Sequence, residues 1–477
     1  MHIPGPVSDI SQALVAELGA ENVSGNAEVA QGHAADWSEA AGERPSLVIF
    51  PRTPAQVATA LAILGRFKQK AVIQGGLTGL AGAATPRHGE VALSLSRLNR
   101  IEEFDGIGGT ITVQAGVTLE QVQSRVDAEG WFFPLDLGAR GSCQVGGNAS
   151  TNAGGNRVIR YGTMRDLVLG LEVALPDGTL MTMLNRVTKN NTGIDLKHLF
   201  IGAEGILGVI TRLVLKLAPK PSSTVTAMCA LASFDDAALL LKEMQLHLPT
   251  LSAFELMWQG FIDKAVEITG ARQPFAERHP VYVLVELLGA SDEQDRAQLQ
   301  TFLERALEQA LVQDVIVAQS IEQAKQLWNY RESIGEMLSR LKPHAAFDVG
   351  IPVAAMDGFV RSVQKTLQQE FPQQSHLFFG HLGDGNLHLL SGPYAAPVTL
   401  HEVEEIVYRA VGDVHGSISA EHGIGVIKKA FLHRSRSSPE LALMGALKRL
   451  LDPENVLNVG RVIDPGDEGL GGEANRV

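Results

Sequence analysis

Short apolar runs and amphipathic stretches alternate in the first half of the chain. Residues 47–50 form an apolar run typical of a strand, and apolar residues recur at helical spacing through 51–68. A second apolar run, 71–76, leads into a glycine-rich loop, so a βαβ unit is predicted here. Residues 91–98 and 110–116 alternate apolar and polar side chains, as half-buried strands do.

Strands and helices alternate at longer spacing in the second half. This pattern predicts an α+β domain distinct from the first. Strands are expected at 224–231, 253–258, 280–289, 347–352 and 376–382, and helices at 235–248, 291–312, 321–341 and 353–371. The changes of pattern divide the chain into an N-terminal helical segment (1–44), a first domain (45–221), a second domain (222–415), a C-terminal segment completing the active site (416–463) and a tail expected to be disordered (464–477).

Composition narrows the classes of function. A chain of 477 residues is too long for one simple core. Its net charge of −13 argues against nucleic acid and anionic membranes as partners. Two cysteines, Cys143 and Cys229, provide no disulfide framework. Neither a signal-like N-terminus nor an apolar stretch of about 18 residues occurs, so a cytoplasmic protein is expected, with at most peripheral membrane association through its electron acceptor.

The 49 glycines cluster in loops, which suggests backbone packed closely around a ligand. Loop 74–82 could form an anion site from successive N–H groups, although it is neither a P-loop nor a GxGxxG fingerprint, and a plain turn fits it about equally well. Segment 138–155 reads either as a surface loop or as a wall against a planar polar ring. Its lack of Lys, Glu and Pro favours the wall. Segment 199–211 has the same character.

Two histidines flank a Gly-Asp-Gly turn in the second domain. If residues 380–388 form a strand–turn–strand, the rings of His381 and His388 can converge, and neutral imidazoles suit zinc and other divalent ions. A third ligand must come from elsewhere, and Glu421, followed by His422, is available. Two ordinary core or turn histidines explain the pattern about equally well.

Taken in order, the glycine segments resemble the flavin domain of the vanillyl-alcohol-oxidase/p-cresol-methylhydroxylase superfamily. More narrowly, residues 45–463 resemble the FAD-linked D-2-hydroxy acid dehydrogenases, the branch with D-lactate dehydrogenases, the glycolate oxidase large subunit and D-2-hydroxyglutarate dehydrogenases. Segment 146–155 is close to diagnostic. The resemblance implies an α+β fold: a two-subdomain FAD-binding domain, an α+β cap with an antiparallel sheet, and a C-terminal segment that returns to the flavin domain.

The resemblance also implies which residues hold FAD. Loop 74–82 would hold the pyrophosphate, and segments 138–155 and 202–210 would line the flavin ring and ribityl chain. Because loop 74–82 has no histidine tether, non-covalent FAD is expected, with Cys143 a small buried residue. The residues expected at the cofactor are Gly75, Gly76, Leu77, Thr78, Gly79, Leu80, Gly82, Gly138, Ser142, Gly146, Gly147, Asn148, Thr151, Asn152, Ala153, Gly154, Gly155, Tyr161, Gly162, Glu204, Gly205, Ile210 and Asn458.

The same resemblance implies a reaction. His381, His388 and Glu421 match the family's metal ligands, with zinc the first candidate, and His422 matches its catalytic histidine. The hydrogen on Cα would leave as hydride to flavin N5. The metal would lower the hydroxyl pKa, and the histidine would take the proton.

Arg331 matches a substrate-carboxylate arginine, although a surface helix arginine is the competing interpretation. Three other acid-binding positions of the 2-hydroxyglutarate branch hold apolar or small residues. A monocarboxylic substrate is therefore predicted, unless Lys342 or His344 supplies the missing charge. The three positions are Gly335, Ala346 and Leu390.

Three alternatives stay open. The chain could be a glycolate-oxidase-type subunit of a complex, a metallohydrolase using His381, His388 and Glu421, or a flavin-binding subunit without turnover. For the dehydrogenase, the expected partners are a small 2-hydroxy acid and an electron acceptor such as an electron-transfer flavoprotein, a quinone or a cytochrome. A homodimer is possible.

Overall fold

The computed structural model describes residues 6–38 and 40–466, so most of the tail predicted to be disordered lies outside the described residues. The chain forms two compact units, each described here by itself. Unit 1 comprises 1–155, 162–220 and 421–477, and unit 2 comprises 156–161 and 221–420. The chain passes from unit 1 to unit 2 after residue 220 and returns after residue 420, close to the predicted boundaries at 221 and 415. That residues 156–161 belong to unit 2 was not predicted.

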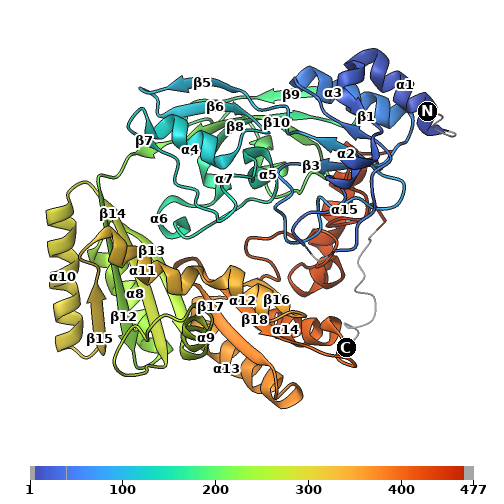
Figure 1. Cartoon of the computed structure of the whole chain (residues 1–477). Helices are drawn as coiled ribbons and strands as arrows, with labels where there is room; N and C mark the ends of the chain where they lie inside the picture. The colour runs from blue at the N-terminus through green and yellow to red at the C-terminus, as the bar shows by residue number, and fades with distance from the viewer. Residues whose placement is uncertain (1–5, 39, 467–477) are drawn as a thin grey trace. The chain divides into compact units, whose positions relative to one another are not determined.

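Unit 1 begins with the predicted βαβ unit. Its first sheet has the order β1-β2-β4-β3, and β4 runs parallel to both β2 and β3. Helix α3 links β2 to β3, and it starts where the Thr53 side chain accepts a hydrogen bond from the Gln56 N–H, with Pro54 in the first turn. Helix α1 packs against α3 (Figure 1). The bounds are α1 (Pro6–Leu18), β1 (Val23–Ser24), α2 (Ala27–Gln31), β2 (Val48–Ile49), α3 (Pro54–Arg66), β3 (Ala71–Gln74) and β4 (Val91–Ser94).

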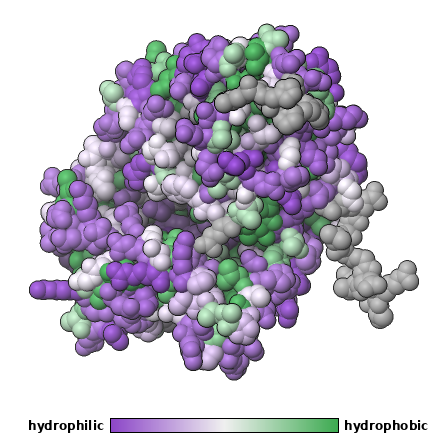
Figure 2. All heavy atoms as spheres, turned by 45° about the vertical axis from the view of Figure 1, so that its right-hand side comes forward, coloured by the Kyte–Doolittle hydropathy of each residue, from purple (hydrophilic) through white to green (hydrophobic). Residues whose placement is uncertain are grey.

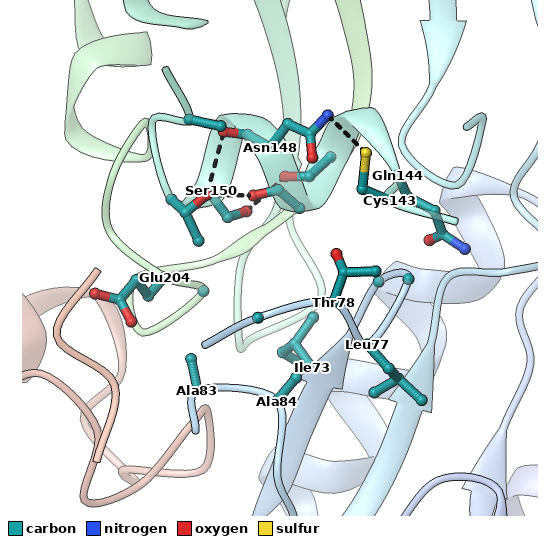
Figure 3. Close-up of a pocket in the computed structure, with 18 of the residues that line it drawn as sticks. Ile73, Leu77, Thr78, Ala83, Ala84, Cys143, Gln144, Asn148, Ser150 and Glu204 are labelled. Carbon is teal, nitrogen blue, oxygen red and sulfur yellow. Dashed lines mark hydrogen bonds between the residues drawn. The ribbon is translucent and has the colours of Figure 1, made fainter. Parts of the chain in front are cut away.

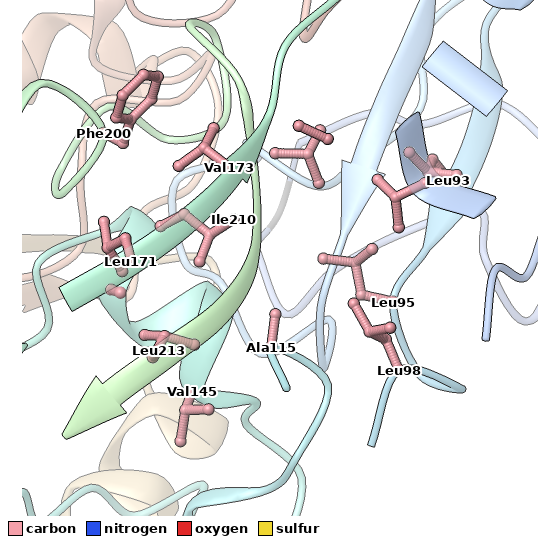
Figure 4. Close-up of a cluster of buried hydrophobic side chains, with 14 of the residues drawn as sticks. Leu93, Leu95, Leu98, Ala115, Val145, Leu171, Val173, Phe200, Ile210 and Leu213 are labelled. Atoms are coloured by element: carbon pink, nitrogen blue, oxygen red, sulfur yellow. The ribbon is translucent and has the colours of Figure 1, made fainter. Parts of the chain in front are cut away.

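The second sheet of unit 1 is antiparallel, with the order β5-β6-β10-β8-β9. Side chains of both sheets contribute to one hydrophobic core, part of which Figure 4 shows. The bounds are β5 (Ile101–Asp105), β6 (Thr110–Gln114), α4 (Leu119–Asp127), β7 (Trp131–Phe132), α5 (Val145–Ser150), α7 (Met164–Leu167), β8 (Val168–Ala174), β9 (Leu180–Met183), β10 (Val209–Lys216), β11 (Ala218–Pro219) and α15 (Ser438–Leu451).

The prediction that β4 and β6 are half-buried was wrong, because both are buried at every residue. On β6, Ile111 and Val113 face the core as expected. The polar side chains of β6 are also buried, because neighbouring strands contribute hydrogen-bonded and ion-paired side chains beside them. Gln114 donates a hydrogen bond to Glu102, and Arg212 pairs with both Glu102 and Glu172.

Unit 2 contains a seven-stranded antiparallel sheet with the order β15-β12-β14-β13-β17-β18-β16. The antiparallel α+β cap is therefore confirmed. The strands are β12 (Ser223–Leu231), β13 (Leu251–Trp258), β14 (Val281–Gly289), β15 (Asp314–Val317), β16 (Ala345–Gly350), β17 (Ser375–His381) and β18 (Asn386–Gly392). The helices are α6 (Val158–Tyr161), α8 (Phe234–His247), α9 (Gln259–Thr269), α10 (Asp292–Glu308), α11 (Ile321–Glu332), α12 (Ile334–Arg340), α13 (Val353–Glu370) and α14 (Leu400–Asp413).

Helices α9, α11 and α12 share one apolar cluster with alternate residues of the sheet, including Met257, Phe379 and Leu390. The prediction of one helix over 321–341 was wrong, because the chain breaks between α11 and α12 at Ser333. The Ser333 hydroxyl donates to the carbonyl of Tyr330, a local bond that competes with the helical ladder.

Hydrophilic side chains dominate the face drawn in Figure 2, as the acidic composition suggests. Of the helices in the described part of the chain, none combines the length and the apolar character that crossing a membrane would require.

Candidate cofactor and substrate site

A cavity of about 410 Å³ lies in unit 1, where the predicted glycine segments meet. Its walls come from residues within 73–84, 137–154 and 204–210, with Glu421, His422 and Asn458 from the C-terminal segment. In Figure 3 the side chains of 143–150 lie on one side, those of 73–84 lie opposite, and Glu204 lies at one end. Three segments that are far apart in the sequence therefore form one cavity.

Two glycines allow the walls to approach each other. A Cβ on Gly76 would lie 2.0 Å from the carbonyl oxygen of Ser142, and a Cβ on Gly146 would lie 2.5 Å from the Cβ of Ala115. Both distances are far below contact, so these positions accept only glycine unless the backbone shifts. The loop after β3 thus packs backbone to backbone against the turn before α5, and α5 packs closely against Ala115.

The residues present fit a flavin nucleotide. Gly138 and Gly147 line the cavity, and a Cβ on either would meet no atom within 4 Å, so the wall leaves open space there. Gln144 is buried, and its Oε1 has no hydrogen-bond partner among the described residues. A donor on a bound ligand would satisfy this oxygen. Leu77 and Ile210 add apolar surface suited to a ring system.

Most of the residues predicted at the cofactor line this cavity. Six do not: Gly82, Ser142, Asn152, Gly155, Tyr161 and Gly162. Asn152 accepts a hydrogen bond from the Arg165 N–H, a Cβ on Gly155 would lie 2.1 Å from the carbonyl oxygen of Asp136, and Tyr161 belongs to unit 2.

Sequence reasoning missed several lining residues. Gln144 and Leu137 lie in or next to a segment already singled out, so its glycine signal could have found them. Trp37 lies in an irregular stretch and has no such signal.

Cys143 lines the cavity as a buried free thiol. Burial raises its pKa, and the Asn148 amide donates a hydrogen bond to Sγ at 3.6 Å. A protonated thiol is a poor nucleophile, so the environment favours a packing role over a covalent tether.

The C-terminal segment is anchored to the cavity by two buried polar side chains. The carboxylate of Glu204, whose φ is +50°, accepts hydrogen bonds from the N–H groups of Ile424 and Gly425 at 2.7 and 2.8 Å. Burial raises the pKa of Glu204, an effect these two bonds oppose. Asn458 accepts from the Ile73 N–H and donates to the Glu204 carbonyl. The stretch directly after His422 is therefore held in place.

Arg461, which sequence reasoning did not select, strengthens this attachment. It is fully buried, pairs with Glu90, and donates to the carbonyls of Ala83 and Thr85 at 3.1 and 2.6 Å. Ala83 lines the cavity, so the end of the chain supports the glycine loop directly.

In unit 2 the predicted strand–turn–strand over 380–388 is present as β17, a 3₁₀ turn (Leu382–Asp384) and β18. Gly385, with φ +76°, closes the turn. The register places His381 opposite Asn386 and Phe379 opposite His388, so all four side chains share one face. The two histidine ring centroids lie 5.4 Å apart, and the expected convergence of the rings is confirmed.

A buried carboxylate connects His381 to Arg331. Glu255 Oε1 lies 2.6 Å from His381 Nδ1, and Glu255 Oε2 accepts from Arg331 Nε at 2.7 Å. Burial alone would raise the pKa of Glu255, but the charges and hydrogen bonds of His381 and Arg331 outweigh it and lower the pKa. Arg331 is 6% exposed, and its guanidinium lies 4.9 Å from the centroid of the Phe379 ring. The interpretation of Arg331 as a surface arginine is therefore wrong.

The three positions that were predicted to lack an acid-binding side chain differ in their surroundings. Leu390 is buried in the apolar cluster under α12 and lies directly opposite Ala346, which is exposed. Gly335 is exposed on α12.

Glu421 and His422 are the first residues of the segment that returns to unit 1, and both line its cavity. The residue before them, Ala420, ends unit 2. Its N–H donates to the carbonyl of Asp348 on β16, and Asp348 lies opposite His388 on β18.

A cavity walled by glycine backbone and supported by the C-terminal segment is the arrangement expected of a flavoprotein. Comparison with family models agrees: residues 45–184 match the FAD binding domain, and residues 220–462 match the C-terminal domain of the FAD linked oxidases.

Curated relatives indicate the branch of this family to which the chain is similar. The chain is 40% identical over 433 residues to a probable mitochondrial D-2-hydroxyglutarate dehydrogenase of Oryza sativa subsp. indica, covering 90% of this chain and 77% of the relative. It is 39% identical over 441 residues to the D-2-hydroxyglutarate dehydrogenase of Xanthomonas citri pv. viticola (91% and 92%). It is 39% identical over 436 residues to a putative mitochondrial D-lactate dehydrogenase of Schizosaccharomyces pombe (88% and 82%).

Solved structures agree on the fold. p-Cresol methylhydroxylase superposes with a TM-score of 0.78 at 17% identity, covering 97% of this chain and 98% of that one. An alkyldihydroxyacetonephosphate synthase gives 0.74 at 14%, covering 96% and 86%. The chain belongs to the FAD-linked oxidase family, among the FAD-linked D-2-hydroxy acid dehydrogenases.

Proposed function

We propose that this protein oxidises a small D-2-hydroxy acid to the 2-oxo acid, with FAD bound non-covalently in the cavity of unit 1 and a divalent metal bound at His381, His388 and Glu421. The observation that carries the proposal is the cavity itself. It has room at Gly138 and Gly147, an unsatisfied amide oxygen at Gln144, and His422 in its wall. The names of the relatives, D-2-hydroxyglutarate and D-lactate dehydrogenases, give the substrate class.

In the cofactor site, the backbone around Gly75 to Gly79 would take the pyrophosphate, and the α5 segment would face the ring. FAD, when bound, supplies the acceptor for the hydride that leaves the substrate Cα. The protein's contribution is to hold the substrate in place and to remove the hydroxyl proton.

For the metal site, unit 2 supplies two imidazoles on adjacent strands. His381 turns Nδ1 toward Glu255, so Nε2, which contacts Arg331 Nη2 at 3.4 Å, is the ring nitrogen that would bind the metal. Ala420 is hydrogen-bonded to Asp348, the strand neighbour of His388, and Glu421 is the next residue along the chain. Chain connectivity therefore supports Glu421 as the third ligand. A divalent ion there, with zinc our first choice, would lower the pKa of the substrate hydroxyl.

His422 would take the hydroxyl proton, because a neutral imidazole accepts protons near neutral pH. Arg331 would hold the substrate carboxylate. Its Nε donates to Glu255 and its Nη2 contacts His381 Nε2 at 3.4 Å, so Nη1 is the nitrogen that would donate to the carboxylate. The electrons would then pass from the flavin to an electron-transfer flavoprotein, a quinone or a cytochrome.

The test is anaerobic reduction of the purified flavoprotein by a panel of D- and L-2-hydroxy acids. We expect D-acids to bleach the flavin absorbance, and we expect His422→Ala to slow bleaching by about two orders of magnitude or more, the scale of a lost general base. Failure of every D-2-hydroxy acid to reduce the flavin would contradict the proposal.

The metal assignment has its own test. We expect His381→Ala to lose bound metal and to lower kcat by roughly 100-fold, while the visible spectrum of the flavin persists. His247→Ala, a change at an exposed histidine, is the control and should retain both metal and activity. Full activity in the metal-free enzyme would contradict the assignment.

A further inference from the structure

Glu255 is a fully buried charged group on the face of the sheet that carries the two histidines. It is 0% exposed, on β13, and the strand register places it directly opposite His381 on β17. Each carboxylate oxygen has a different partner: Oε1 contacts His381 Nδ1 at 2.6 Å, and Oε2 contacts Arg331 Nε at 2.7 Å. One carboxylate thus fixes two side chains to which the proposed function gives separate roles.

The chemistry of this contact fixes the orientation of the imidazole. An ionised carboxylate can only accept hydrogen bonds, so Nδ1 of His381 must be the donor. In the neutral ring the lone pair then lies on Nε2, the atom that would bind a metal in place of its 3.4 Å contact with Arg331 Nη2. Without Glu255, the ring could rotate or adopt the other tautomer.

Glu255 also affects the charge of the site. Arg331 Nη2 lies 3.4 Å from His381 Nε2, so a permanent positive charge lies beside the nitrogen that would face a metal. Two neighbouring cations in a buried site repel each other strongly. The negative charge of Glu255 neutralises Arg331, and its bond to Nε holds the guanidinium in place over the Phe379 ring.

We propose that Glu255 is a positioning residue of the metal site, which orients His381 for metal binding and neutralises Arg331 so that a divalent cation can bind beside it. This inference rests on the metal assignment made under the proposed function. It goes further by making a residue that touches neither substrate nor metal responsible for metal affinity.

The competing explanation is a buried ion pair that only stabilises the cap. The same sheet offers a matched control for it. Glu286, on β14, is 5% exposed, pairs with Arg157 at 3.2 Å, and accepts a hydrogen bond from Ser252. It is a second buried carboxylate–arginine pair on this sheet, and its known contacts are with an arginine and a serine.

The experiment titrates metal-stripped, FAD-loaded protein with Zn²⁺ in competition with a chromophoric chelator. Glu255→Gln removes the charge, and Glu255→Asp keeps the charge but shortens its reach by one methylene, so that it can no longer serve both partners. We expect either variant to weaken zinc affinity by about 10- to 100-fold, the usual cost of losing the partner of a ligating histidine. Glu286→Gln should bind zinc as the wild type does. Flavin absorbance and melting temperature report folding.

Wild-type zinc affinity in both Glu255 variants would overturn the inference and leave the metal assignment intact. An equal loss of affinity in Glu286→Gln would also overturn it, because the effect would then come from cap stability. If Glu255→Gln fails to fold, the zinc affinity of Glu255→Asp tests the inference. If the wild type itself binds no zinc, the metal assignment and this inference fail together, whereas reduction of the flavin by D-2-hydroxy acids is measured separately.

Discussion

Gly147 provides a direct test of where the flavin lies, because the fold and the ligand place opposite demands on it. It lies in the first turn of α5 and lines the cavity, and a Cβ there would meet no protein atom within 4 Å. Replacing a helical glycine by alanine stabilises a helix by up to about 1 kcal/mol. Gly147→Ala should therefore fold normally and make the FAD-free protein slightly more stable.

The bound state should respond in the opposite way. If the flavin lies against this wall, the added methyl group intrudes on a close contact, and overpacking of this kind costs about 1–3 kcal/mol. Since about 1.4 kcal/mol corresponds to a factor of ten, the dissociation constant for FAD should rise by roughly 5- to 150-fold. The predicted signature is a raised melting temperature without FAD together with weaker FAD binding.

The assay reconstitutes apoprotein with FAD, follows the quenching of flavin fluorescence, and records melting curves with and without FAD. Gly358→Ala is the matched control. Gly358 lies within α13 of unit 2, is exposed, and has equal room for a Cβ, so this variant should gain stability with no change in FAD affinity. Wild-type FAD affinity in Gly147→Ala would show that the flavin does not lie along α5.

Three further predictions follow from the same structure. Acid precipitation should release FAD into the supernatant, because the buried Cys143 thiol is protonated and loop 74–82 offers no histidine; flavin retained in the washed pellet would contradict this. Burial raises the pKa of Glu172, but hydrogen bonds from Arg212, Thr211 and Thr182 outweigh it and lower the pKa below its ordinary value of 4.5. The stability that this carboxylate contributes is present above its unfolded-state pKa and lost as the pH falls through its folded-state pKa. The difference in urea midpoint between wild type and Glu172→Gln should therefore shrink below pH 4.5, and a constant difference would argue against the pair. D-lactate or a larger monocarboxylic D-2-hydroxy acid should have a higher kcat/KM than D-2-hydroxyglutarate, since a second buried carboxylate without a partner costs several kcal/mol; a tenfold advantage for D-2-hydroxyglutarate would refute this.

The sequence predicted those features that depend on residue type and local spacing. Glycine clusters marked the cavity walls, because backbone can approach backbone or ligand closely only where Cβ is missing, as at Gly76 and Gly146. The Gly-Asp-Gly turn marked the hairpin that brings His381 and His388 together.

Features that depend on long-range pairing could not be predicted in this way. Glu255 looks like an interruption in an apolar strand until the register places His381 opposite it. Arg461 looks like one arginine among many until the fold buries it against Glu90. The full burial of β6 also depends on a polar network contributed by other strands, which periodicity within β6 cannot reveal.

The attachment of the C-terminal segment to β3 has a consequence for biosynthesis. Ile73 and Asn458, which share a hydrogen bond, are 385 residues apart, so at about 5–20 residues per second the ribosome needs roughly 20–80 seconds to produce the partner of an early strand. Unit 2 is nearly continuous in sequence and can fold during that interval. Unit 1 cannot complete its folding in that interval, because Glu204, Ile73 and Ala83 all bind residues beyond 420. Its glycine loops lack these contacts until then. The flavin site is therefore completed only after residues 424–461 have been synthesised, long after its glycine loops.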